Sequence, residues 1–191
     1  MSAAFQLLPR MQQVQSHSAE VLTQIFQPDV NLAIWQRDSN DRISAYAQSL
    51  SNAHALQFVA EPKELASLLE QRLPEAEGKA DFIADLELLS QMLACLMDCT
   101  AVGFRLKLLE KAMCPRFHTD HVALRLLVTY AGAGTEWQSE ASALPHQQIG
   151  TGDVALLKGS AWNDSKDTAI WHRSPQTTQP RLLLSLDPVG E

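Results

Sequence analysis

The residues best suited to chemistry are a histidine and an aspartate two positions apart, His118 and Asp120, and a second histidine, His172, which lies 54 positions after His118. If residues 118–130 form one strand, His118 and Asp120 point to the same side of it, because side chains alternate faces along a strand. His172 ends another predicted strand, 169–172. Two imidazoles and one carboxylate make the facial triad of non-haem Fe(II) sites, which leaves coordination positions open. We therefore predict that His118, Asp120 and His172 bind one divalent metal ion.

An arginine, Arg181, opens the last predicted strand, nine positions after His172. The open positions of a facial triad suit a bidentate co-substrate and O₂. A guanidinium group forms a charge-assisted, bidentate pair with a carboxylate, so Arg181 is a candidate for binding the carboxylate of such a co-substrate. The alternative is a surface arginine that merely begins a strand.

Other readings of the metal residues stay open. The same three ligands could hold Zn²⁺, with water, His121 or Cys114 as the fourth ligand of a tetrahedral site. Four strand residues would place Cys114 about 13 Å from His118, unless Pro115 turns the chain. A buried His–Asp hydrogen bond beside an unrelated histidine would need no metal. By strand parity, His121 and Arg125 fall on the opposite face, where we expect them to pack against helices.

The first hundred residues are predicted to be mainly helical and to support the site. Apolar residues recur every three or four positions over residues 10–26, 62–73 and 80–98, which indicates amphipathic helices. The second of these begins with Pro62, a residue favoured at a first helical position. Residues 30–35 and 55–59 are exceptions that are typical of strands and could add edges to a later sheet.

From residue 101 the hydrophobic period changes from 3.6 to 2. Strands are predicted over 102–108, 118–130, 135–137, 153–159, 169–172 and 181–186, with glycine-rich turns at 132–134 and 150–152. We therefore predict one α+β domain over residues 1–191. Residues 101–191 would form a double-stranded β-helix, a jelly-roll or cupin-like barrel, and residues 1–100 a helical layer packed on it.

Composition narrows the possible partners. The formal net charge of −7 argues against nucleic-acid binding, and the sequence contains no apolar run of membrane-spanning length. No secretory signal is evident, and Cys95, Cys99 and Cys114 form a sparse, odd set that is typical of reduced thiols. We predict a cytoplasmic location. No phosphate-binding glycine loop and no Gly-x-Ser-x-Gly elbow is present, so kinase and hydrolase functions are not supported.

The second half of the chain resembles the Fe(II)/2-oxoglutarate dioxygenases, particularly the prolyl-hydroxylase-like branch. The likeness covers about residues 114–188 and lies in four segments: His118-Thr119-Asp120, residues 152–157, His172-Arg173-Ser174-Pro175, and Arg181 with its apolar strand. The resemblance implies a hydroxylase that couples oxidative decarboxylation of 2-oxoglutarate to oxidation of a substrate.

By this resemblance, Fe(II) would be held by the three predicted ligands and the distal carboxylate of 2-oxoglutarate by Arg181. Tyr130, which has the strand parity of His118 and Asp120, would be a second co-substrate contact. Such enzymes often carry a serine two residues after the arginine. This chain has Leu183 there, and Ser185 is the next residue of that parity and a further candidate.

The run from Cys114 to Leu127, together with 152–159 and 172–175, also looks like an uncharacterised bacterial family of unknown function. Trp35, Gln36 and Arg37 share in that likeness, which therefore spans most of the chain. The resemblance implies that the gene for this protein accompanies genes for zinc handling. It keeps open a second function, a non-catalytic zinc-binding protein of metal homeostasis. Exposed edges of a small barrel often pair, which would allow a homodimer.

Overall fold

Two β-sheets form the frame of the protein in a computed structural model that describes residues 11–38, 40–50, 55–139, 145–163 and 166–190. The large sheet contains seven strands, in the spatial order β1 (Gln12–Ser16), β2 (Val30–Trp35), β8 (Val154–Lys158), β5 (Leu124–Ala131), β10 (Arg181–Val189), β4 (Ala101–Leu109) and β3 (Leu56–Ala60). The small sheet contains β7 (Gln147–Gln148), β6 (Glu136–Gln138) and β9 (Trp171–Arg173). Every pairing is antiparallel except β1 with β2.

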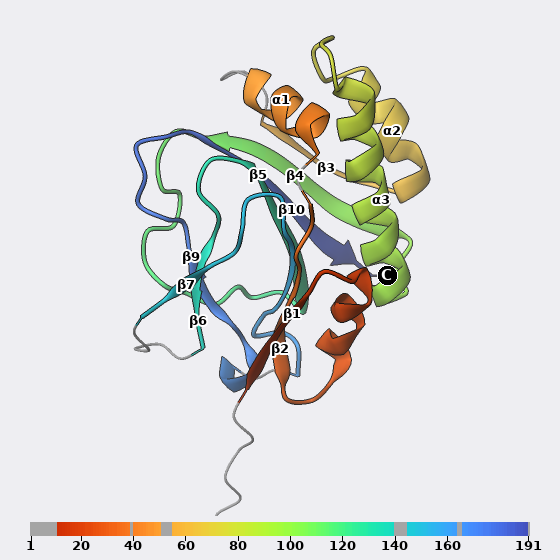
Figure 1. Cartoon of the computed structure of the whole chain (residues 1–191). Helices are drawn as coiled ribbons and strands as arrows, with labels where there is room; N and C mark the ends of the chain where they lie inside the picture. The colour runs from red at the N-terminus through yellow and green to blue at the C-terminus, as the bar shows by residue number, and fades with distance from the viewer. Residues whose placement is uncertain (1–10, 39, 51–54, 140–144, 164–165, 191) are drawn as a thin grey trace, which may run out of the picture.

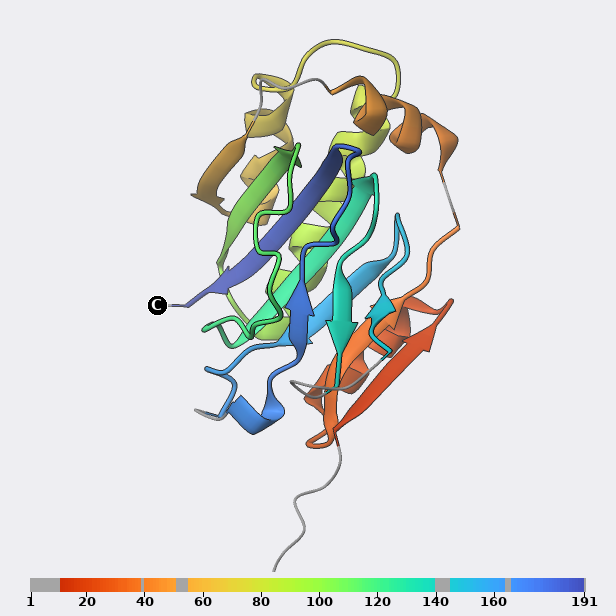
Figure 2. The same ribbon diagram turned by 90° about the vertical axis from the view of Figure 1, so that its left-hand side faces the viewer.

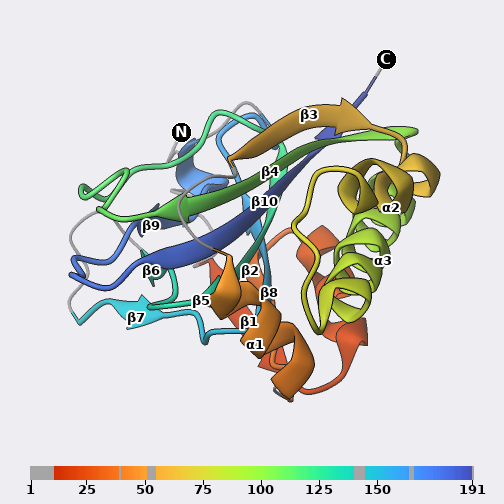
Figure 3. The same ribbon diagram turned by 90° about the horizontal axis from the view of Figure 1, so that it is seen from above.

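Helices cover one face of the large sheet (Figures 1 and 3). They are η1 (Ala19–Phe26), α1 (Asp41–Ser49), α2 (Pro62–Glu70) and α3 (Lys79–Met97); a short turn of 3₁₀ helix, η2 (Lys166–Thr168), lies in a later loop. The 3.6 periodicity of α3 buries Phe82, Leu86 and Leu89 completely against sheet residues such as Phe104 and Leu106. Burying each such side chain contributes roughly 1.5–3 kcal/mol, so this interface anchors the sheet that carries the site.

The small sheet faces the other side of the large sheet, and Figure 2 shows it in front of that sheet with α3 behind. A second apolar cluster fills the space between the sheets, with Leu32, Leu127, Leu157, Trp137 and Ile170 among its members. The predicted barrel is therefore not closed among the described strands. The described strands pair as two separate sheets, which are held face to face by side-chain packing and not by a continuous hydrogen-bond ladder.

The N-terminal half differs from the predicted helical layer, because it supplies β1, β2 and β3 to the large sheet. Instead of one helix over 10–26, strand β1 is followed by η1, and residue 10 lies outside the described residues. The strand ends at Ser16, and Ser18 caps η1 by accepting a hydrogen bond from the Glu20 amide. Parallel pairing of β1 with β2 outweighs the local helical pattern here.

Other predicted elements occur close to their expected bounds. The helices predicted from Pro62 and over 80–98 are α2 and α3, and the strands predicted over 30–35 and 55–59 are β2 and β3. Helix α1 was not predicted; Asn40 caps it by accepting hydrogen bonds from the amides of Arg42 and Ile43. Among the described helices, none combines the length and apolarity needed to span a bilayer.

Candidate metal centre

Backbone pairing brings the two predicted histidine ligands together, although they belong to different segments. His118 and His172 form an isolated antiparallel bridge, in which each amide donates to the other's carbonyl over 3.0 Å. His172 lies in β9 of the small sheet, whereas His118 lies in the connection between β4 and β5. The two ring centroids are 4.6 Å apart. The main chain alone therefore places the imidazoles side by side.

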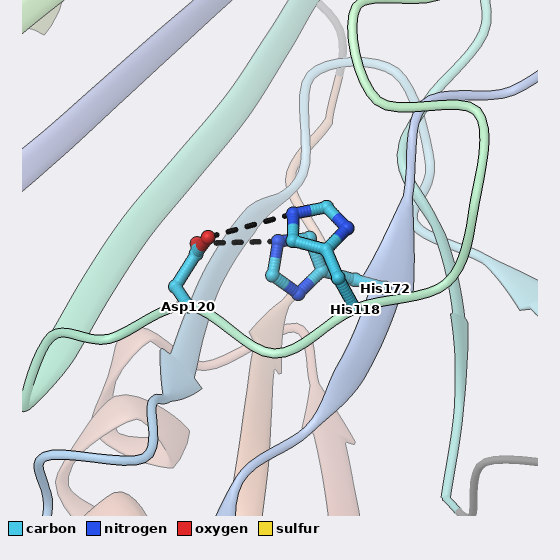
Figure 4. A group of neighbouring side chains, drawn as sticks. All are labelled: His118, Asp120 and His172. Carbon is cyan, nitrogen blue, oxygen red and sulfur yellow. Dashed lines mark ion pairs between the residues drawn. The ribbon is translucent and has the colours of Figure 1, made fainter.

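Backbone carbonyls also orient both rings. Nδ1 of His118 lies 3.0 Å from the Arg116 carbonyl oxygen, and Nδ1 of His172 lies 3.4 Å from that of Ile170. With Nδ1–H donating to these oxygens, Nε2 of each ring is the nitrogen that would bind a metal ion, in place of the contact it makes with Asp120. Both Nε2 atoms face the Asp120 carboxylate, at 3.5 Å for His118 and 3.2 Å for His172 (Figure 4).

One ligand atom from each of His118, Asp120 and His172 lies within 4.8 Å of the others. Ligand atoms about 2.1 Å from one ion, at right angles to each other, are about 3 Å apart, so this spacing is close to that of a facial triad. Among the described residues, no fourth histidine, cysteine or acidic residue joins the group. The arrangement therefore fits an ion with open coordination positions better than a closed four-ligand site.

Charge around Asp120 keeps its carboxylate ionised. Burial alone would raise the pKa of Asp120, but hydrogen bonds from His118 and His172, with the charges of His172 and Arg125, hold that pKa far below its usual range. The hydrogen bond to Asp120 in turn raises the pKa of His118. A negatively charged ligand flanked by two imidazoles is a suitable donor set for a divalent cation.

Gly159 allows the ligand loop to lie against the large sheet. The Gly159 amide donates to the Ala123 carbonyl, and the Ser160 amide donates to the Asp120 carbonyl. A Cβ at Gly159 would collide with the carbonyl oxygens of Asp120 and Val122, so only glycine permits this approach. Strand β8 ends at Lys158, and two residues later the Ser160 amide makes the hydrogen bond that holds the Asp120 backbone in place.

A cavity of about 110 Å³ opens beside the three ligands. Arg181, the first residue of β10, lies in its wall and is only 1% exposed. Its guanidinium donates to the hydroxyls of Thr129 and Thr135 over 3.1 and 3.0 Å, and more distantly to Ser174 at 3.4 Å. Its Nε has no hydrogen-bond acceptor among the described residues.

The buried Arg181 cation also lacks a carboxylate within ion-pair distance among the described residues. Burial lowers the pKa of Arg181 to about 10, against the charge of Glu136, so the side chain remains cationic at neutral pH. An unpaired buried charge is costly unless a counter-ion arrives. This part of the cavity is therefore suited to binding an anion.

Ser185 and Leu183 follow Arg181 on the same side of β10, and both line the cavity. The Ser185 hydroxyl is buried and has no hydrogen-bond partner among the described residues. It is therefore available to a ligand in the cavity. Leu183 packs against the cluster between the sheets and supplies an apolar wall to the cavity.

The expected role of Tyr130 in co-substrate binding is not supported, because the structure places this residue on the other face of β5. Its hydroxyl donates to Asp85 of α3 at 2.5 Å, and Arg37 donates to the other oxygen of the same carboxylate at 2.6 Å. Residues 121–123 are irregular between Asp120 and β5, so strand parity does not carry across them. Arg125, Leu127 and Thr129 face the site instead.

Replacing Tyr130 with phenylalanine should therefore lower stability without weakening ligand binding. Loss of a buried hydrogen bond to a charged acceptor should cost about 1.5–3 kcal/mol of unfolding free energy. Denaturant unfolding measures this loss, and calorimetric titration with 2-oxoglutarate should give the parent dissociation constant. A tenfold weaker binding of 2-oxoglutarate at unchanged stability would restore Tyr130 to the site.

Arg125 is the site residue that strand parity missed. It was expected among the helices, but it donates to Asp120 and, through Nε and Nη2, to Asp187 at 2.6 and 2.8 Å. Asp187 also accepts a hydrogen bond from Arg105 at 2.9 Å. These contacts connect the carboxylate ligand to β10 and β4 and restrain its orientation.

The two residues considered as a fourth zinc ligand lie differently. His121 contacts the Ser160 hydroxyl at 3.1 Å through Nδ1 and is not part of the ligand group. Cys114 lines the cavity, and its carbonyl accepts a hydrogen bond from the Ser174 amide, but its thiol also stands outside that group. Neither completes a tetrahedral site with the three ligands.

Comparison with known protein families identifies the family to which this chain belongs. Residues 16–187 match a family model described as "Protein of unknown function (DUF1826)". The chain belongs to the DUF1826 family. No curated protein matches it. The DUF1826 match includes the cavity-lining residues and the N-terminal strand β2.

Solved structures share the fold of this DUF1826 chain at low sequence identity. One is the dioxygenase for auxin oxidation 1 of Arabidopsis thaliana in binary complex with 2-oxoglutarate, with a TM-score of 0.52, 13% identity and coverage of 81% of this chain and 74% of that one. Another is a prolyl-4-hydroxylase of Pseudomonas putida, with a TM-score of 0.52, 11% identity and coverage of 91% and 98%. The jelly-roll fold of 2-oxoglutarate oxygenases is therefore the fold to which this chain is similar.

Proposed function

We propose that this DUF1826 chain is an Fe(II)/2-oxoglutarate-dependent oxygenase that hydroxylates an as yet undefined substrate. One observation carries the proposal. A group of two histidines and one aspartate, with coordination positions to spare, shares a cavity with a buried arginine that has no acidic partner among the described residues. The fold it shares with 2-oxoglutarate oxygenases supports the same conclusion.

The donor set fits the metal. His118 and His172 would bind Fe(II) through Nε2, and Asp120 through one carboxylate oxygen, because these atoms converge. The carbonyls of Arg116 and Ile170 hold each ring in the tautomer that this requires. Arg125 restrains the Asp120 carboxylate without blocking its other oxygen, which lies nearer His118.

The polar atoms of the cavity fit the co-substrate. Arg181 would pair with the distal carboxylate of 2-oxoglutarate through its unpartnered Nε, while Thr129 and Thr135 accept hydrogen bonds from Nη2 and hold the guanidinium in place. Ser185 would donate its hydroxyl to the same ligand. Leu127 and Leu183 would cover the carbon chain and exclude water, which strengthens the ion pair.

When bound, Fe(II) and 2-oxoglutarate supply the oxidation chemistry: one oxygen atom of O₂ enters the substrate and the other enters succinate as CO₂ is lost. The residues of the chain have the complementary task of orienting these groups and limiting access by water. From the sequence resemblance alone, we propose Zn²⁺ as the competing ion and metal homeostasis as the setting in which the reaction would serve.

The direct test is turnover of the co-substrate. We expect protein purified without oxygen and loaded with Fe(II) to release succinate from 2-oxoglutarate when O₂ is admitted, slowly if no substrate is present. Heat-denatured protein and protein loaded with Zn²⁺ are the controls. Isothermal titration with Mn²⁺ as an oxygen-stable substitute measures 2-oxoglutarate binding independently of turnover.

Three results together would contradict the oxygenase proposal. If the protein holds Zn²⁺ tightly, releases no succinate with Fe(II), and gives no heat of 2-oxoglutarate binding with any divalent ion, the oxygenase proposal fails. The non-catalytic zinc-binding function would then be the better account of the same three ligands.

A further inference from the structure

The cavity beside the three ligands is strongly cationic, although the whole chain carries a net charge of −7. Five basic side chains line it: Arg105, Lys107, Arg125, Arg173 and Arg181. Among the described residues, three carboxylates contact this group: those of Asp120, Asp187 and Glu136. A divalent metal ion and a 2-oxoglutarate dianion would cancel each other, so a surplus of two positive charges would persist in the loaded site.

Most of these cations already have a partner or an assigned role. Arg125 pairs with Asp120 and Asp187, and Arg173 pairs with Glu136 at 2.5 Å. Arg181 is assigned to the co-substrate by the proposed function. Two cations on β4 are left. Arg105 shares Asp187 with Arg125, and the Lys107 ammonium has no hydrogen bond or ion pair to any described residue.

The alternation of β4 directs both of these cations toward the cavity. Phe104 and Leu106 are buried on the helical side, so Arg105 and Lys107 face the opposite side. In the register of β4 with β10, Lys107 stands opposite Leu183 and Arg105 opposite Ser185. Paired strands are about 5 Å apart, so β4 forms a cationic wall immediately beside the β10 wall.

The cationic wall of β4 lies nearer the protein surface than the position assigned to the co-substrate. Arg181 is 1% exposed, whereas the Arg105 side chain is 36% exposed. A co-substrate paired with the buried Arg181 would occupy the inner part of the cavity. A second molecule would then have to bind toward the outer part of the cavity, where the β4 cations are accessible.

We propose that the substrate of this site is an anionic small molecule, and that Lys107 and Arg105 receive its carboxylate or phosphate group. This inference rests on the proposed function, since it takes the Arg181 position as already filled. Lys107 contributes a mobile point charge and Arg105 a planar fork of donors, a combination that binds either anion. The positive surplus would also attract such a substrate from solution.

The test uses probe pairs that differ in charge, with the protein saturated with Mn²⁺ and 2-oxoglutarate in the absence of O₂. The pairs are phenyl phosphate with benzyl alcohol, and benzoate with benzamide, and binding is measured by calorimetry and ligand-observed NMR. We expect each anionic probe to bind about tenfold tighter than its neutral partner, the equivalent of one charge-assisted contact. Raising the salt concentration should reduce this preference.

Substitutions of the two β4 cations test whether the anionic probes bind beside them. Lys107→Gln should abolish the preference for the anionic probe, Arg105→Gln should reduce it, and Lys107→Arg should retain most of it. Lys63→Gln is the matched control, because Lys63 is an exposed lysine outside the cavity. Equal binding of charged and neutral probes by the parent, or equal behaviour of Lys107→Gln and Lys63→Gln, would overturn the inference.

Titration of 2-oxoglutarate into the same variants separates the two proposals. Lys107→Gln should leave 2-oxoglutarate affinity within about twofold of the parent, because Arg181 carries that contact. A tenfold loss would make Lys107 a co-substrate contact, which overturns this inference and leaves the oxygenase proposal standing. Failure of the parent itself to bind 2-oxoglutarate would overturn both.

Discussion

Asp120→Asn should abolish tight metal binding while leaving the fold intact. The exchange keeps the shape of the side chain but removes the only anionic ligand of the group and puts an NH₂ donor in place of one of the two oxygens that face the imidazoles. Even changes behind a ligand typically cost about tenfold to a hundredfold in metal affinity, so removal of a charged ligand should cost more than about a hundredfold. Titration with Mn²⁺ or Co²⁺ under anaerobic conditions measures the loss.

The matched control is Asp81→Asn, because Asp81 is an exposed carboxylate on α3 that pairs with Arg42 outside the cavity. It should bind metal as the parent does. The Asp120 variant should still fold cooperatively, since Arg125 keeps Asp187 as a partner. Parent-like metal affinity in Asp120→Asn, and also in the double variant His118→Ala/His172→Ala, would show that the three residues are not a metal site.

Arg181→Met should remove 2-oxoglutarate binding without affecting the metal. Truncating one member of a buried ion pair costs about 2–5 kcal/mol, which is at least about a thirtyfold loss of affinity. Arg181→Lys keeps the charge but loses the planar fork, so it should recover only part of the binding. Calorimetry with the Mn²⁺-loaded protein measures both effects.

The stability of Arg181→Met distinguishes a binding role from a structural one. In the ligand-free protein the Arg181 cation is buried without a carboxylate partner among the described residues. Replacing it with an apolar side chain of similar length should keep the thermal midpoint at or above that of the parent. A collapse of the midpoint would assign Arg181 to the fold, and unchanged 2-oxoglutarate affinity would exclude it from the co-substrate site.

Sequence patterns predicted most of the elements, because periodicity reports which face of an element is buried. Helix α3 and strand β10 are examples, with long and regular apolar repeats. Gln12–Ser16 shows the limit of this reasoning. A short polar strand acquires its structure from a neighbour, here β2, and nothing in its own five residues specifies that pairing.

Residue types were enough to predict the metal ligands, whereas counting residues along a strand did not predict which face the other side chains lie on. His118, Asp120 and His172 were chosen as metal-binding residue types, and the structure brings them together. Tyr130 and Arg125 were assigned to faces by counting residues from His118, and the irregular residues 121–123 reverse that assignment. The surrounding sequence, Thr119 to Ala123, carries no glycine or proline that would have indicated the break.

The paired backbone hydrogen bonds between His118 and His172 have a consequence for metal exchange. In small zinc domains the ion organises the polypeptide, so the apoprotein is unfolded and loading is a folding reaction. Here the main chain sets the spacing of both imidazoles before any ion arrives. We therefore expect a metal ion to bind to a site that is already formed. Such an ion could leave and be replaced without unfolding or refolding of the chain.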